Sequence, residues 1–207
     1  MKTSTYILLA SDESIERSKN ALTEHGITVH IAASSDETKQ IVHSLIPEGA
    51  EVMTATSTTL NQLGLTDEIN DSGKYNSIKS QLSKLDREIN GLAMQKLGAA
   101  PDYIIGSVHA VTEDGKVIVA SGSGSQLPAY TFGSSHVVWV VSTKKIVKNL
   151  DEGLDRINTH VLPLEDERMK EVYGPKAGSR VNKLFILNNE MHPARINLIF
   201  VKEDLGF

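Results

Sequence analysis

Three apolar stretches in the middle of the chain are separated by polar, glycine-containing loops. Residues 103–111, 116–120 and 136–141 are rich in isoleucine and valine and are bounded by turn residues. Stretches of this length and composition are typical of buried β-strands. The loops that follow the first two stretches, residues 112–115 and 121–125, carry polar side chains. We therefore predict three buried strands and expect functional residues in these two loops.

Apolar residues in the rest of the chain alternate between helical and strand spacing. Ser, Thr and Asp precede several helical segments, and glycine often follows them, as expected for caps. The pattern predicts a first helix that begins near Ser11. Further helices are predicted at residues 35–46, 58–63, 77–97, 127–132, 148–158 and 164–173. Further strands are predicted at residues 27–31, 51–56, 184–187 and 196–201. The Gly-Pro turn within residues 173–179 indicates a mobile loop.

Strands that alternate with helices are typical of a mainly parallel sheet with helices on both faces. We predict an open, Rossmann-like α/β fold of this kind. The length favours a single domain over residues 1–207, in which residues 1–50 form a helix-and-strand part packed on the core.

The composition is ordinary for a globular protein, with 40% hydrophobic and 23% charged residues. Apolar runs such as residues 6–10 are far shorter than the roughly 20 residues that span a bilayer. The same run is too short for the apolar core of a secretory signal. We therefore expect no membrane segment and a cytoplasmic location.

Cysteine is absent from the chain, which excludes disulfides, cysteine-ligated iron-sulfur clusters and a thiol nucleophile. The net charge of -5, without a basic cluster, argues against nucleic-acid binding. The seven histidines are scattered and lack zinc-ligand spacing, so we predict no metal site. The expected partner is a small molecule or another protein.

Several stretches together resemble a known family. Residues 101–141 combine an acidic-glycine turn, an apolar strand, a glycine-rich loop and a valine-rich strand, and residues 45–65, 144–157 and 195–207 extend the likeness. On these stretches the chain resembles the LUD-domain, or lactate-utilisation, family. The resemblance implies the open sheet shared with ribose-phosphate isomerases, glucosamine-phosphate deaminases and acyl-CoA transferases, and a role in lactate or small-organic-acid metabolism. Related chains often carry cysteines before the last strands; residues 176–195 have none, so no redox role of such cysteines carries over.

The first candidate site is a hydroxyl-rich turn where a predicted strand meets a predicted helix. It consists of Thr56, Ser57, Thr58 and Thr59. Hydroxyls and the free amides of a helix start bind phosphate or carboxylate groups, and ligands gather at the carboxyl ends of parallel strands. The simpler interpretation is that Ser57 or Thr58 only caps the helix. The LUD resemblance favours ligand binding, because related folds use this turn for phosphate.

The second candidate site is the turn formed by Thr112, Glu113, Asp114 and Gly115. Asp-Gly is a strong hairpin signal, and a simple turn explains Asp114 and Gly115. Glu113 resembles the nucleophilic glutamate in the Glu-x-Gly turn of acyl-CoA transferases. Such a carboxylate can attack an acyl group or act as a general base. Glu113 is therefore our candidate catalytic residue, and its neighbours in the turn are candidate ligand-binding residues.

The third candidate site is the loop at residues 121–125, with Gly122, Gly124 and Ser125 as ligand-binding candidates. Glycines allow backbone amides to approach an anion closely. The alternative is a tight turn between a strand and a helix. The loop lacks the complete dinucleotide fingerprint and the Walker ending, so we predict no nucleotide cofactor.

Basic residues add two further candidates. Lys144 and Lys145 follow the valine-rich strand at its carboxyl end, and one of them, for which we select Lys144, is expected to meet an anionic ligand. A solvated pair is the simpler interpretation. His109 either faces a cleft or is hydrogen-bonded near a strand end. Trp139 is expected in the core.

Two functional hypotheses follow. The first is an enzyme of isomerase or acyl-transfer type that acts on an organic acid, a phosphorylated metabolite or an acyl-CoA. Oxidation of lactate by this chain alone lacks an evident electron acceptor. The second is a non-catalytic metabolite-binding or accessory subunit of an iron-sulfur lactate oxidation system. The sequence leaves the oligomeric state open.

Overall fold

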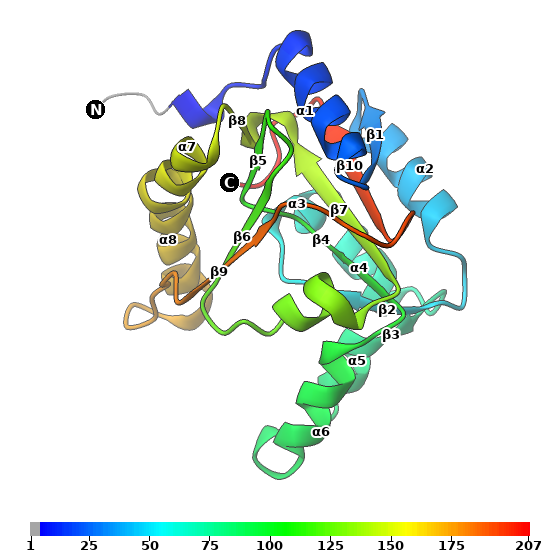
Figure 1. Cartoon of the computed structure of the whole chain (residues 1–207). Helices are drawn as coiled ribbons and strands as arrows, with labels where there is room; N and C mark the ends of the chain where they lie inside the picture. The colour runs from blue at the N-terminus through cyan, green and yellow to red at the C-terminus, as the bar shows by residue number, and fades with distance from the viewer. Residues whose placement is uncertain (1–4) are drawn as a thin grey trace.

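A computed structural model describes residues 5–207 (Figure 1). Residues 1–4, part of the stretch on which the cytoplasmic location was predicted, lie outside that range. The central feature is a six-stranded sheet of order β1-β10-β7-β4-β2-β3, in which every neighbouring pair is parallel. Its strands are β1 (Thr28–Ala32), β2 (Glu51–Thr54), β3 (Asn76–Ser77), β4 (Tyr103–Gly106), β7 (His136–Ser142) and β10 (Ile196–Val201).

Alternate residues of the central strands point to opposite faces of this sheet and build two hydrophobic cores. Ile104 and Trp139 belong to the core that includes residues of α1, and Ile105 and Val138 belong to the core shared with α2, α3 and α4. Helices therefore cover both faces, and the predicted open, mainly parallel α/β sheet is confirmed. The helices are α1 (Asp12–Glu24), α2 (Ser35–Leu45), α3 (Thr58–Gln62) and α4 (Leu65–Asp71).

A second, four-stranded sheet of order β8-β5-β6-β9 packs on the first core. Its β6 pairs antiparallel with β5 and β9, while β5 and β8 are parallel. One face of β6 contributes Val117 and Val119 to the core of the central sheet, and the other contributes Ile118 to a third cluster that includes Ile157. The strands are β5 (Ala110–Thr112), β6 (Val117–Ser121), β8 (Ile146–Val147) and β9 (Lys183–Leu187).

The predicted single strand at residues 103–111 is in fact two strands in different sheets. β4 ends at Gly106, residues 107–109 cross between the sheets, and β5 begins at Ala110. The crossing segment stays largely inside the protein, so it keeps apolar residues and its pattern resembles a continuous strand. Ser107 and His109 interrupt that pattern, and both line the cleft described below.

The long helix predicted at residues 77–97 is divided into α5 (Ile78–Leu82) and α6 (Arg87–Ala99). The division falls at Asp86, whose side chain accepts hydrogen bonds from the backbone N–H groups of Glu88 and Ile89 and starts a new helix. Figure 1 shows α6 extending away from the body of the protein. Its exposed face carries Ile89 and Leu92, which are 82% and 66% exposed.

The remaining helical segments border the second sheet or connect the strands. α7 continues through a π-helical turn into α8, and this long segment stands beside β5, β6 and β9 in Figure 1. The predicted helices at 148–158 and 164–173 are therefore joined. These segments are η1 (Thr5–Ile7), η2 (Ala129–Gly133), η3 (Thr143–Lys145), α7 (Leu150–Arg156), η4 (Ile157–Val161) and α8 (Leu162–Tyr173).

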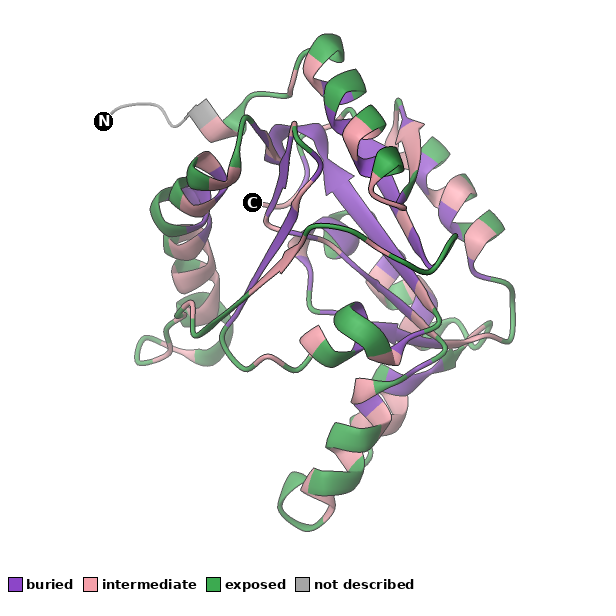
Figure 2. Cartoon of the chain, in the orientation of Figure 1, coloured by how far each residue is buried: buried purple, intermediate pink, exposed green. Residues whose placement is uncertain are grey.

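Burial follows this layered arrangement. In Figure 2 most of β4, β7 and β10 is buried, the edge strand β1 is largely intermediate, and α6 is mostly exposed. Among residues 5–207, no helix has both the length and the apolar character needed to cross a bilayer.

Candidate functional site

A cleft of about 1210 Å³ opens at the carboxyl ends of β2, β4 and β7. Its floor consists of the segments that directly follow these strands, at residues 55–59, 107–109 and 145. The other walls are formed by the end of β6 with the loop after it, by η4 and α8, and by residues of the segment 176–182. In open parallel sheets, ligands bind beyond the carboxyl ends of the strands. This cleft is therefore the candidate site.

All four residues of the hydroxyl-rich turn line this cleft: Thr56, Ser57, Thr58 and Thr59. Ser57 also caps α3, since its side chain accepts a hydrogen bond of 3.3 Å from the backbone N–H of Leu60. The geometry therefore allows Ser57 to cap the helix while the turn faces a ligand in the cleft. Ligand binding by its hydroxyls remains a prediction.

Lys145 is buried on the floor of the cleft, with only 4% of its surface exposed. Its Nζ lies 3.0 Å from Ser107 Oγ, 3.2 Å from Thr59 Oγ1 and 3.2 Å from the carbonyl oxygen of Val108. Within residues 5–207, no carboxylate forms a salt bridge with this amine. Burial first, and then the positive charges of Arg156 and Lys144, lower the pKa of Lys145 well below its usual value of 10.5.

His109 lines the same cleft as a neutral imidazole. Its Nδ1 lies 3.1 Å from the backbone nitrogen of Ala120, and because a backbone N–H can only donate, Nδ1 accepts and the ring proton is on Nε2. Burial, followed by the charges of Lys145 and Arg156, lowers the pKa of His109 to about 3. His109 therefore presents an uncharged N–H donor at neutral pH.

Arg156 places a further positive charge behind the cleft floor. Its guanidinium is fully buried, and Nη1 donates a hydrogen bond of 2.6 Å to the carbonyl oxygen of His109. Nε and Nη2 have no hydrogen-bond partner among residues 5–207. Burial lowers the pKa of Arg156 to about 10, which leaves it charged at neutral pH. Its field favours a negatively charged occupant of the cleft.

The rim of the cleft is also rich in cations, although the chain as a whole has a net charge of -5. Its two acidic side chains are already engaged, because Glu165 pairs with Arg168, and Asp166 pairs with Lys170 and accepts from the backbone N–H of Ser179. The other charged side chains on the rim are Lys79, Arg87, Lys176 and Arg180. A cleft with an excess of one sign of charge concentrates ligands of the opposite sign.

The glycine-rich loop reaches the cleft in part. Gly122 and Ser125 line it, whereas Gly124 lies behind them. Gly124 has a φ of +84°, its N–H donates to Ser121 Oγ at 2.8 Å, and a Cβ there would collide with the Lys183 side chain. Gly124 therefore holds the tight turn, while its two neighbours face the cleft.

The acidic turn of residues 112–115 lies away from the cleft, against α1. Glu113 accepts hydrogen bonds from Ser14 Oγ at 2.6 Å and from Arg17 Nε at 2.9 Å. Asp114 contacts Thr112 and Lys116, and the carbonyl oxygen of Gly115 lies 3.0 Å from His25 Nδ1. The catalytic role predicted for Glu113 stays a prediction, and in this geometry it does not involve the cleft.

These contacts make the stability contribution of Glu113 dependent on pH. The hydrogen bond from Arg17, together with that from Ser14, holds the pKa of Glu113 below its usual range. Stabilisation by a lowered carboxyl pKa is present above the unfolded-state value and is lost as the pH falls through the folded-state value. We expect Glu113→Gln to reduce the free energy of unfolding by about 0.5–1 kcal/mol at pH 7, and by less in acid.

Urea unfolding at pH 7 and at acidic pH measures this difference. Glu24→Gln, at an exposed position at the end of α1, is the control and should leave stability unchanged. If Glu113→Gln lowers the free energy of unfolding by the same amount at both pH values, the lowered pKa of Glu113 does not contribute to stability.

Lys144 and Lys145 point in different directions after β7. Lys144 Nζ pairs with Asp204 and donates to the carbonyl oxygen of Gly206 at 2.7 Å, and Lys144 does not line the cleft. The 3-10 turn η3 separates the two side chains, a turn that the apolar pattern does not reveal. Lys144, the residue predicted to meet an anionic ligand, is therefore the neighbour of the lysine that lies on the cleft floor. Binding by Lys144 remains a prediction.

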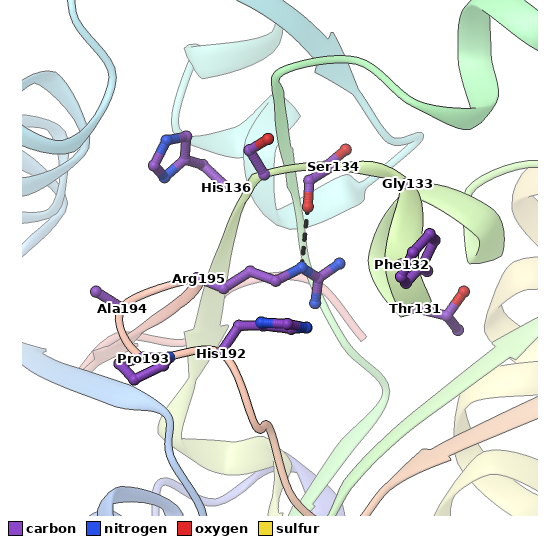
Figure 3. A pocket seen from close by; sticks show the side chains of 10 residues that line it. Thr131, Phe132, Gly133, Ser134, His136, His192, Pro193, Ala194 and Arg195 are labelled. Carbon is purple, nitrogen blue, oxygen red and sulfur yellow. Dashed lines mark hydrogen bonds between the residues drawn. The ribbon is translucent and has the colours of Figure 1, made fainter.

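A second hollow, of about 370 Å³, lies near the amino ends of β7 and β10 (Figure 3). His136 and His192 line it, and Arg195 points toward Ser134. The Arg195 guanidinium is already engaged, since it donates to the carbonyl oxygens of Ser134, Ala129 and Tyr130 and pairs with Glu190. We therefore assign this hollow a structural role.

Metal ligands do not gather in the described part of the chain: no group of three His, Cys, Asp or Glu side chains there has a geometry that holds an ion.

A six-stranded parallel sheet with a cleft at its carboxyl ends defines a Rossmann-like α/β protein. The family model of the LUD domain matches residues 15–200, and the chain belongs to this family. The fold is also that of a DUF162 family protein from Deinococcus radiodurans, whose crystal structure is 13% identical and matches with a TM-score of 0.58 over 94% of this chain and 99% of that one. No curated protein sequence matches the chain.

Proposed function

We propose that this LUD-domain protein binds a small organic anion in the cleft at the carboxyl ends of β2, β4 and β7, and that it acts in lactate or small-organic-acid metabolism. The candidate ligands are an organic acid, a phosphorylated metabolite and an acyl-CoA. The observation that carries the proposal is the positive charge around the cleft, from Arg156 behind its floor and from the basic side chains on its rim. Lys145 adds a buried hydrogen-bonding amine on the cleft floor.

The family resemblance and the cleft support an enzyme of isomerase or acyl-transfer type. Lys145 and His109 supply an amine and a neutral N–H donor within one cleft. Groups with strongly shifted pKa values that line a cleft are typical of catalytic sites. We place the protein in the cytoplasm, with no nucleotide cofactor.

The alternative is a non-catalytic, metabolite-binding or accessory subunit of an iron-sulfur lactate oxidation system. One observation favours it: α6 extends from the body and is mostly exposed (Figure 2). Ile89 and Leu92, three residues apart on one helical face, are exposed apolar side chains of this helix. Exposed apolar surface of this kind is typical of protein contacts.

Ligand-induced thermal stabilisation tests the binding proposal, because a ligand that binds only the folded state raises its melting temperature. We expect at least one of lactate, pyruvate, ribose 5-phosphate and acetyl-CoA to do so. Ser57→Ala should weaken that response. Ser34→Ala is the matched control, since Ser34 caps α2 as Ser57 caps α3 but lies outside the cleft.

Each variant loses an N-cap and should lower the free energy of unfolding by about 1 kcal/mol. Only Ser57→Ala should also reduce the ligand response. Equal responses in both variants would move the binding site away from this cleft. No response to any of the four compounds would favour the accessory-subunit alternative.

A further inference from the structure

We propose that Lys145 is an imine-forming amine and that the natural ligand of the cleft carries a ketone or aldehyde carbonyl beside its negative charge, as a 2-oxo acid does. This inference rests on the proposed anion-binding function and names the reactive group and the substrate class for it. It starts from the contacts of one atom, Lys145 Nζ.

The surroundings of Lys145 suit a neutral amine. Nζ donates to three oxygen atoms, those of the Val108 carbonyl and of the Thr59 and Ser107 hydroxyls. All three oxygens are neutral, so none supplies the negative charge that holds a lysine in its ammonium form. Lys144, the next residue along the chain, has instead the surroundings of an ammonium ion, paired with Asp204. Of these two adjacent lysines, Lys144 has a carboxylate as a partner, whereas Lys145 has neutral oxygen atoms.

The charges that face Lys145 act in the same direction. The Lys144 ammonium and the Arg156 guanidinium are positive, and His109 is neutral at physiological pH. Burial in a site with positive neighbours favours the uncharged form of an amine, which is the nucleophilic form. The same positive charges attract an anion, so the site brings a nucleophilic amine and a negatively charged ligand together.

The reaction balances without an oxidant or a reductant. The Nζ lone pair attacks the carbonyl carbon and forms a C–N bond, while the carbonyl π electrons move to oxygen, which takes up a proton given up by the nitrogen. The carbinolamine then loses its hydroxyl as water, with the second nitrogen proton, and a C=N bond forms. The hydroxyls of Ser107 and Thr59, both within 3.2 Å of Nζ, are placed to relay these protons.

An imine gives the cleft a chemical capability that fits the isomerase-type hypothesis. When the imine nitrogen is protonated, the C=N group withdraws electrons from the next carbon of the ligand, and a proton on that next carbon becomes easier to remove. This is the step that moves a carbonyl group or a hydrogen between neighbouring carbons.

Reductive trapping tests the inference. The full chain is incubated at pH 7 with glyoxylate and sodium cyanoborohydride, which reduces an imine to a stable secondary amine, and the modified residue is located by peptide mass spectrometry. We expect Lys145 to be labelled at least about tenfold faster than any other lysine, because each unit by which a pKa is lowered raises the neutral fraction about tenfold. Lys19→Arg, at an exposed position on α1 outside the cleft, should leave the labelling unchanged, and Lys145→Arg should abolish the fast adduct.

Mapping in the unsubstituted protein identifies the labelled residue even if a variant does not fold. Labelling spread evenly over exposed lysines, or an unlabelled Lys145, overturns the inference. Thermal stabilisation by an organic anion without a Lys145 adduct would leave the proposed binding function standing and remove the imine. Loss of both would remove the proposed function as well.

Discussion

Replacing Arg195 with methionine is expected to lower the free energy of unfolding by about 3–5 kcal/mol. Arg195 and Glu190 form a buried ion pair of 2.7 Å in which each side chain is 8% exposed. Arg195 also donates to the carbonyl oxygens of Ser134, Ala129 and Tyr130, which belong to η2 and its end. The substitution therefore leaves a buried carboxylate and several buried carbonyl groups without their donor. Urea unfolding monitored by circular dichroism measures the loss.

A double variant separates the charge effect from the loss of packing. Arg195→Met combined with Glu190→Gln no longer buries an unpaired carboxylate, so its stability should lie above that of Arg195→Met alone. If the two substitutions lower the free energy of unfolding additively, the ion pair contributes little to stability. A loss below about 1 kcal/mol for Arg195→Met would show the same.

Gly106→Ala is expected to destabilise the protein by about 1–3 kcal/mol or more. Gly106 lies beside Trp139 in the β4–β7 pairing, and Tyr130 fills the space over it with its ring edge-on to Trp139 at 5.4 Å. A Cβ at this position would fall closer to Tyr130 Oη and to Ala55 Cβ than the 3.0 Å that real Cβ atoms keep. Tyr130 is 1% exposed, and protein interiors are closely packed, so its ring can move away only by displacing other side chains.

Gly91→Ala is the matched control for this substitution. Gly91 lies within α6, where a Cβ would meet no atom within 4 Å, and alanine favours helix. It should be neutral or stabilise the protein by up to about 1 kcal/mol. Thermal unfolding of the two variants compares the same chemical change in a crowded and in an open place. A Gly106→Ala protein as stable as Gly91→Ala would contradict the packing described here.

Most of the longer strands were predictable because they are rich in apolar residues and bounded by polar or turn residues. The prediction for residues 196–201 coincides with β10, and the stretch at 136–141 lies within β7. The sheet to which each strand belongs was harder to predict from the sequence, because strand pairing depends on contacts between residues far apart in the chain. A crossing segment such as residues 107–109 is buried like the strands on either side of it.

The candidate site was predictable where it follows directly from a strand end. The turn at Thr56–Thr59 was placed at the end of a strand, and it lines the cleft. The sequence could not show which of Lys144 and Lys145 lies in the cleft, because both follow β7 and only the geometry of η3 separates their side chains. The position of Glu113 could not be predicted from the sequence either, since it depends on the packing of α1 against the β5–β6 hairpin.

The order of the central sheet also determines when the protein can be completed during synthesis. β10 comes last in sequence, yet it lies between β1 and β7 and is hydrogen-bonded to both. Until residues 196–201 leave the ribosome, β1 has no neighbour and β7 presents an open edge. The nascent chain therefore carries two strands with unpaired edges, β1 and β7, and such edges are prone to aggregation. Long-range parallel pairing of this kind also forms slowly. Completion of the sheet marks the end of this vulnerable period.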